Sequence, residues 1–267
     1  MNANKKVVKS KKDIYARYGI EYKNGKINVP EFGFIPELLI DGNSKLGKGV
    51  WTFSTLAGTK NYHVTINEKE YDILGTCICD CIGCYAQTGF YNMNNVQISN
   101  AIKTYLCRNY SEFVKNAIIA QIKANDIKLL RIHASGDFFN DEYIEMWRDI
   151  VKECENCVFW TYTKIARAEK AFDNFPNANI VKSCIDNFGV NFGHCDYILR
   201  LYKALKAENK AVYICRCGID KNQHCTNCKG CSKNEYVLFI EHSTDYKAEL
   251  DPAYNELKSI IESQDAQ

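Results

Sequence analysis

The chain has 267 residues, of which 46% are hydrophobic and 25% are charged, and its formal net charge is +2. These values are typical of a globular protein of one large or two small domains. The net charge is too small to indicate electrostatic attraction of the whole protein to nucleic acid or to a membrane. No stretch approaches the roughly 20 apolar residues of a membrane span. The amino-terminal residues also lack the apolar core of a secretory signal. We therefore expect a cytoplasmic protein with no membrane partner.

The first 60 residues are predicted to form an irregular, basic extension that packs on the core. Glycine recurs in this stretch between short apolar runs. Its first 12 residues contain five lysines, namely Lys5, Lys6, Lys9, Lys11 and Lys12. These lysines are either a solvated tail or an arm that contacts the phosphates of a nucleic acid.

Residues 62–74 predict a β-hairpin, because two β-rich runs flank Asn67-Glu68-Lys69. A cluster of four cysteines follows between residues 77 and 84. Residues 96–124 carry apolar side chains at helical spacing, and Ser111 is the expected N-cap that divides this stretch into two helices.

Predicted strands and helices alternate along the rest of the chain. Strands are expected within 128–139 and at 157–163, 179–186, 211–217 and 236–242. Helices are expected at 141–153, 166–173 and 196–207, with a final helix that starts at Asp251 and Pro252. This order predicts an α/β fold with a parallel sheet, as a partial (β/α) barrel or an open sheet. The predicted regions are the extension 1–60, a β/α core 61–217 and a cysteine-rich segment with the final helix, 218–267.

Fourteen cysteines in a chain without an export signal indicate metal or redox chemistry, because disulfides are rare in a reducing cytosol. In the first cluster, Cys77, Cys81 and Cys84 have the spacing C-x3-C-x2-C. Three thiolates at this spacing can hold a [4Fe–4S] cluster and leave its fourth iron open to a small molecule. Cys79 is a fourth candidate ligand. A closed iron–sulfur site, a tetrahedral zinc site and a group of unliganded thiols are therefore alternatives.

The second cluster lies near the carboxyl end of the chain. Cys225, Cys228 and Cys231 form a C-x2-C-x2-C run, which is typical of a ferredoxin-type [4Fe–4S] cluster. Cys215 or Cys217 is the natural fourth ligand. Zinc is the alternative, with two ligands from Cys215 and Cys217 and two from the run.

The remaining candidate residues lie where predicted strands end, which is where an α/β fold places its active face. A Ser-Gly-acid turn can hold the ammonium group of an amino acid, although a plain turn in which Asp137 caps the next helix is the alternative. The candidate catalytic residues are Asp137, His133 and Lys164. The candidate cofactor-binding residues are Ser135, Gly136, Asp137, Tyr85, Ser183 and Asp186.

Several stretches together resemble a family of phage and prophage proteins called gene product 88, which has no established activity. The resemblance spans roughly residues 40–245. The matching segments are Asn43–Phe53, Ala57-Gly58, Cys84-Tyr85-Ala86 with Gly89 and Tyr91, Arg131–Phe138, Tyr162-Thr163-Lys164, and the last cysteine run with Val237, Phe239 and His242. The chain departs from the family in an insert between Gly58 and Cys77. The resemblance implies a phage or mobile-element origin and cysteines that bind a cluster.

A more distant similarity links the first cluster to the radical S-adenosylmethionine enzymes, although Gly83 replaces their usual aromatic residue before the last cysteine. This similarity implies an enzyme that cleaves S-adenosylmethionine, modifies an unknown substrate, for which a macromolecule is one candidate, and takes electrons from a ferredoxin or flavodoxin. One or two [4Fe–4S] clusters would be the cofactors. The alternatives are a zinc- or cluster-stapled module that binds nucleic acid or protein, and an electron-transfer protein.

Overall fold

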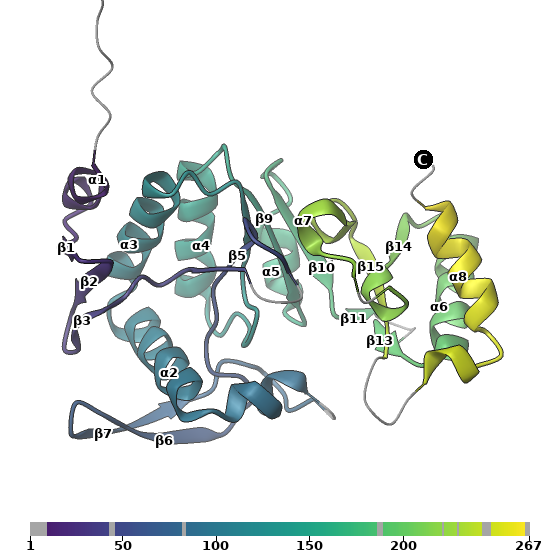
Figure 1. Ribbon diagram of the computed structural model, residues 1–267, viewed down its shortest axis with the longest axis horizontal. Helices are drawn as coiled ribbons and strands as arrows, with labels where there is room; N and C mark the ends of the chain where they lie inside the picture. Colours follow the sequence, from purple (N-terminus) through teal and green to yellow (C-terminus); the bar gives the residue numbers. More distant parts are fainter. Residues whose placement is uncertain are drawn as a thin grey trace, which may run out of the picture. The chain divides into compact units, whose positions relative to one another are not determined.

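The computed structural model describes residues 10–42, 46–81, 84–185, 189–220, 222–228, 230–241 and 247–264. The chain divides into two compact units, which are considered separately below (Figure 1). The first unit comprises Met1–Ile40 and Trp51–Cys157, and the second comprises Asp41–Val50 and Val158–Gln267. Strand β4 (Ile40–Asp41) lies where the chain first passes from one unit to the other.

The amino-terminal stretch is more regular than the sequence predicted. Helix α1 (Lys11–Arg17) begins with a capping box, in which the side chains of Ser10 and Asp13 each bond to the backbone amide of the other. An antiparallel sheet of short strands follows, formed by β1 (Tyr22–Lys23), β2 (Lys26–Val29) and β3 (Gly33–Pro36). Strands of two to four residues are too short to show a clear alternation, which is why the sequence pattern missed them.

The predicted hairpin is confirmed as β6 (Asn61–Ile66) paired with β7 (Lys69–Leu74). Its two-residue turn places Asn67 and Glu68 in the left-handed region, which suits the twist of a tight hairpin. Helices α2 (Asn94–Asn109) and α3 (Ser111–Ala124) follow. The division at residue 110 was predicted, but Ser111 is the first residue of α3 and Tyr110 occupies the N-cap, without a side-chain bond.

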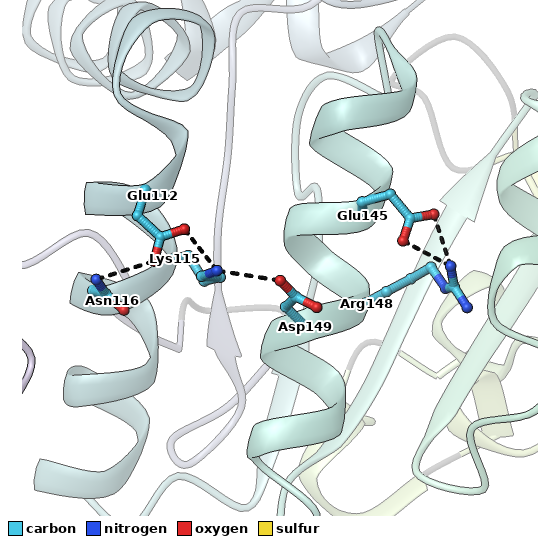
Figure 2. Close-up of polar contacts among 6 residues, drawn as sticks. All are labelled: Glu112, Lys115, Asn116, Glu145, Arg148 and Asp149. Carbon is cyan, nitrogen blue, oxygen red and sulfur yellow. Dashed lines mark hydrogen bonds and ion pairs between the residues drawn. The ribbon is translucent and has the colours of Figure 1, made fainter.

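Strand β5 (Trp51–Thr52) pairs in parallel with β8 (Leu129–Arg131) in the first unit. Helix α4 (Asp141–Glu153) confirms the predicted 141–153 and packs beside α3 (Figure 1). Figure 2 shows polar contacts on and between these two helices, where Lys115 of α3 bonds to Glu112 at 2.7 Å and to Asp149 of α4 at 3.2 Å. Ion pairs as exposed as these contribute little to stability, so the buried faces hold the two helices together.

The second unit contains two sets of parallel strands. Strand β9 (Val158–Thr163) pairs in parallel with β10 (Ala178–Lys182), and helix α5 (Ala166–Ala171) connects them. Strand β15 (Tyr236–Ile240) pairs in parallel with both β13 (Phe192–Gly193) and β14 (Val212–Ile214). The other elements are β11 (Cys184–Ile185), β12 (Gly189–Val190), α6 (Cys195–Ala207), α7 (Cys225–Cys228) and α8 (Tyr254–Ser263).

The fold is therefore a mixed α/β fold with parallel portions of sheet, as the alternating pattern predicted. The strands among the described residues form no closed barrel. The final helix begins at Tyr254, not at Pro252, because Asp251 accepts the amide of Ala253 in a turn before the helix. Within the described ranges, no helix combines the length and apolar character needed to cross a membrane.

Candidate functional site

The turn Ser135-Gly136-Asp137 follows β8 in the first unit and is held on two sides by hydrogen bonds. Ser135 Oγ donates to the carbonyl of Thr55 at 2.9 Å, and the amide of Thr55 donates to the carbonyl of Ser135 at 2.9 Å. The amide of Asp137 donates to Thr76 Oγ1 at 3.1 Å. Since Thr76 immediately precedes Cys77, this last bond joins the turn to the start of the first cysteine cluster.

Gly136 is required where it stands. Its φ is +86°, and a Cβ atom there would lie 1.9 Å from Thr55 Oγ1 and 2.5 Å from Thr76 Oγ1. Any other residue at this position would therefore place its side chain against both threonines, and its backbone would be strained. The close approach of Gly136 brings the turn against the cysteine segment.

The other end of the first cysteine cluster is also tied to β8. Tyr85 follows Cys84, and its hydroxyl donates to the carbonyl of Ala134 at 2.7 Å and accepts from Arg131 at 2.8 Å. The hydroxyl of Tyr91 donates to the same carbonyl at 3.2 Å. Sequence reasoning selected Tyr85 as a cofactor residue; its hydroxyl anchors the segment, while its ring remains largely exposed.

The thiols of the first cluster lie in an electronegative environment. Burial and, to a smaller extent, the nearby charges of Asp137, Cys84 and Cys81 raise the pKa of Cys77 to about 12, although a hydrogen bond with the backbone of Gly58 offsets part of the shift. Cys79 is exposed. Acidic groups gathered in this way repel one another when they are ionised, and a bound cation relieves that repulsion.

Asp137 does not cap the next helix, so that alternative is wrong. The N-cap of α4 is Asn140, whose side chain accepts the amide of Tyr143 at 2.9 Å. Asp137 is buried, and its Oδ1 accepts the amide of Phe138 at 2.8 Å. The Asp137 carboxylate therefore contacts the turn itself and lies near Cys77 of the first cluster.

His133 is enclosed in an aromatic pocket. Its backbone is left-handed, with φ +59°, its Nε2 lies 2.8 Å from the hydroxyl of Tyr143, and its ring meets the edge of Phe138. Burial and the nearby charge of Arg131 lower the pKa of His133 to about 3, so the ring is neutral at pH 7. Its Nδ1 is buried without a hydrogen bond among the described residues. A catalytic role for His133 stays a prediction, while its placement favours shaping the turn that follows it.

Sequence reasoning missed Lys103, on the buried face of α2. Its Nζ lies 5.7 Å from the centre of the Phe53 ring and has no hydrogen bond or ion pair within the described part of the chain. Burial lowers the pKa of Lys103 to about 8, and the nearby Cys107 partly offsets this shift. The sequence did contain a signal for this residue. A lysine on the apolar face of a predicted helix either extends its ammonium group to solvent or is buried, and the buried case is rare.

The other predicted pocket residues belong to the second unit. Lys164 directly follows β9, and the amide of Ser183, after β10, donates to the carbonyl of Thr163 at 2.9 Å. The carboxyl ends of these two strands therefore meet, as the sequence predicted. Asp186 lies outside the described residues.

The second cysteine cluster is assembled from several short elements of the second unit. Cys215 follows β14, Cys217 lies in a 3-10 helix, Cys225 and Cys228 begin and end α7, and Cys231 lies in a further 3-10 turn. The pKa of Cys215 is raised by a hydrogen bond with Cys217, by burial and by the charge of Cys231. The hydroxyl of Tyr213 lies 2.9 Å from the sulfur of Cys228.

Both clusters offer donors that suit iron or zinc, because thiols are preferred ligands of each. In neither cluster do the side chains converge on one point, since no group of three or more His, Cys, Asp or Glu residues in the described ranges is arranged to hold a metal ion. Binding would therefore require the cysteine side chains to turn toward a common centre.

Comparison with known proteins shows that this chain is similar to phage proteins. The family model described as Gene product 88 matches residues 37–229. The Gene 88 protein of Mycobacterium phage L5 is 27% identical over 156 residues, which cover 51% of this chain and 62% of that protein. The Gene 88 protein of Mycobacterium phage D29 is 34% identical over 65 residues, 24% of this chain and 25% of that protein.

The chain thus spans less than two thirds of the length of these curated relatives. No solved structure matches it. Because the family model covers well over half of the sequence, this chain belongs to the Gene product 88 family.

Proposed function

We propose that Cys77, Cys81 and Cys84 hold a [4Fe–4S] cluster and that the protein is an enzyme similar to the radical S-adenosylmethionine class. One observation carries this proposal: the cysteine segment is hydrogen-bonded at both ends to the strand end that bears Ser135-Gly136-Asp137. A three-thiol segment beside a buried carboxylate can hold a cluster and also bind the amino acid end of a ligand.

In this proposal Asp137, Ser135 and Tyr85 have different roles. A bound cluster supplies the electron that cleaves S-adenosylmethionine into methionine and a 5′-deoxyadenosyl group, and a ferredoxin or flavodoxin replaces that electron. The Asp137 carboxylate would accept the ammonium group of the ligand. Ser135 would hold the turn, because its hydroxyl is already engaged by the carbonyl of Thr55. The exposed ring of Tyr85 would lie beside the ligand.

Three finer features belong to this proposal. The parallel strands would form part of a partial (β/α) barrel or an open sheet, with Lys164 and Ser183 at the carboxyl ends of β9 and β10. The names of the relatives support a phage or mobile-element origin. A cytoplasmic location would keep the thiols reduced.

A second candidate is a stapled binding module, in which the second cysteine cluster holds zinc or an inert iron–sulfur cluster. The observation that favours it is that Cys217 and Cys231 both lie close enough to Cys215 to raise its pKa. An electron-transfer protein with two clusters is a further alternative.

Anaerobic purification followed by iron, sulfide and zinc analysis tests these candidates. We expect brown protein with about four to eight iron and sulfide atoms per chain, and formation of 5′-deoxyadenosine after addition of S-adenosylmethionine and dithionite. Cys84→Ala should abolish that cleavage, while Cys79→Ala, at an exposed neighbour, should retain it. Colourless protein with stoichiometric zinc would support the binding module, and reversible reduction without cleavage would support electron transfer.

A further inference from the structure

The 3-10 turn that carries Cys231 lies against side chains from two strands of the second unit. The Tyr213 ring of β14 packs on Gly230, where a Cβ atom would lie 2.3 Å from Cε1 of that ring. From β10, the side-chain amide of Asn179 donates to the carbonyl of Cys231 at 2.7 Å. These two contacts fix the last cysteine of the run in place.

Helix α7, which ends at Cys228, is held by a loop from much earlier in the chain. The hydroxyl of Thr226, inside α7, donates to the carbonyl of Leu46 at 3.2 Å and to that of Lys48 at 3.0 Å. Gly47 stands between these two residues, and a Cβ atom there would lie 2.6 Å from Thr226 Oγ1. The helix is therefore anchored by contacts that involve no cysteine.

One side chain contacts a sulfur of the run directly. The hydroxyl of Tyr213 lies 2.9 Å from the sulfur of Cys228. Either atom can donate this hydrogen bond while the sulfur carries a proton. A cysteine that binds a metal is a thiolate, which has no proton to donate. If Cys228 is a ligand, the Tyr213 hydroxyl must therefore be the donor.

Tyr213 also relates Cys228 to the rest of the second cluster. The strand ladder continues beyond β14, because the amide of Cys215 donates to the carbonyl of Leu238 at 2.8 Å. Residues two apart in a strand point to the same face, so Tyr213 and Cys215 share a face of this sheet. Cys231 lies near enough to Cys215 to raise its pKa. Cys228 and Cys231 thus approach the face that bears Cys215.

We propose that Tyr213 is a positioning residue of the second cluster, whose hydroxyl donates a hydrogen bond to the Cys228 thiolate when that thiolate binds a metal ion. This inference rests on the proposal that the second cluster holds a metal. Hydrogen bonds from outside the ligand set orient a ligand and tune the metal. Tyr213 therefore holds the Cys228 sulfur in place and withdraws part of its charge.

Cobalt(II) is the probe, because it takes the tetrahedral thiolate sites of zinc and its bonds to sulfur absorb light. It is added without oxygen to the full, reduced chain carrying Cys81→Ser and Cys84→Ser, here called the reference chain, in which the first cluster lacks two thiols. We expect Tyr213→Phe in this chain to bind cobalt about tenfold more weakly. Its thiolate-to-cobalt absorption band should also move to longer wavelength, since a sulfur without the hydrogen bond gives up an electron more easily.

The matched control is Tyr197→Phe, which removes a hydroxyl that donates to the carbonyl of Val190 at 2.8 Å in the same unit. This variant should match the reference chain in both affinity and band position. The band separates a role at the sulfur from a role in folding, because Tyr213→Phe keeps the ring that packs on Gly230. A band that does not move, whatever the affinity, would overturn the role of Tyr213.

The variant Cys231→Ser distinguishes failure of this inference from failure of the metal site itself. If the reference chain binds no cobalt, or if Cys231→Ser binds it equally well, the second cluster is not a metal site and both proposals fail. If Cys231→Ser loses cobalt while Tyr213→Phe behaves like Tyr197→Phe, the metal site stands and only the role of Tyr213 fails.

Discussion

The two cysteine clusters rest on different interiors. Beneath the first cluster the buried side chains are polar, and they include Thr55, Thr76, Ser135 and Asp137. Two backbones there are left-handed, those of His133 and Gly136. Beside the second cluster the buried residues are apolar and regular, with Ile214 and Leu238 in parallel strands against α6 and α8.

A non-glycine residue with a left-handed backbone, such as His133, reduces stability and persists where the surrounding structure or the function requires it. The apolar core beside the second cluster stabilises its unit by burying apolar surface, so its presence does not indicate a functional site. The contrast therefore favours the two proposals above, which give ligand chemistry to the first cluster and a structural role to the second. The predictions below test that division, from the largest expected effect to the smallest.

If the second cluster holds a structural metal, as the second candidate function proposes, Cys231→Ser should lower the free energy of unfolding most, by more than about 4 kcal/mol, because it removes one of the metal's ligands. Cys84→Ser should abolish the chemistry of the first cluster while costing about 1 kcal/mol or less. Urea unfolding and metal analysis of both variants measure the difference. Equal destabilisation by the two substitutions would contradict the division of roles.

Gly136→Ala should cost about 3 kcal/mol, since the new Cβ meets Thr55 and Thr76 and the left-handed backbone becomes strained. Gly89→Ala is the matched control: its φ is +52°, but no atom lies within 4 Å of the added Cβ, so only about 1 kcal/mol should be lost. Equilibrium unfolding in urea gives both values. If the two variants were equally stable, the packing between the turn and the cysteine segment would be looser than described.

Much of this arrangement follows from sequence patterns. The alternation in 62–74 predicted the hairpin, and the single apolar stripe of 141–153 predicted α4. The alternating pattern also predicted that residues 135–137 form the turn after a strand, and they follow β8. These signals are local or depend on topology alone.

The remaining features depend on contacts between segments that are far apart in the chain. Such contacts leave no local pattern in a single sequence from which they could be predicted. Thr55 and Thr76 are ordinary loop residues until the structure brings both against Gly136. The same is true of Gly47, whose partner Thr226 lies far along the chain. Ser111 and Asp251 failed as caps because neighbouring residues occupied those positions at little cost.

Lys103→Met should stabilise the protein by about 2–3 kcal/mol at pH 7, because it removes a buried ammonium without an acceptor. Burial lowers the pKa of Lys103 from 10.5 to about 8, so the unfolded chain binds more protons between these values. Wild-type stability should therefore rise as the pH increases from about 8 to 10.5, and this rise should be missing in the variant. Urea unfolding across this range measures both effects. A destabilised variant would show that Lys103 has a partner.

Tyr143→Phe should have the smallest effect, a loss of about 1–2 kcal/mol, because it leaves the buried Nε2 of His133 without its hydrogen bond. Tyr110→Phe is the control: its hydroxyl bonds to Glu31 at the surface, and its removal should cost less than about 0.5 kcal/mol. Urea unfolding of the two variants gives the comparison. If the Tyr143 hydroxyl proved as dispensable as that of Tyr110, the left-handed backbone of His133 would not depend on this bond, and the aromatic rings around it would have to hold the turn alone.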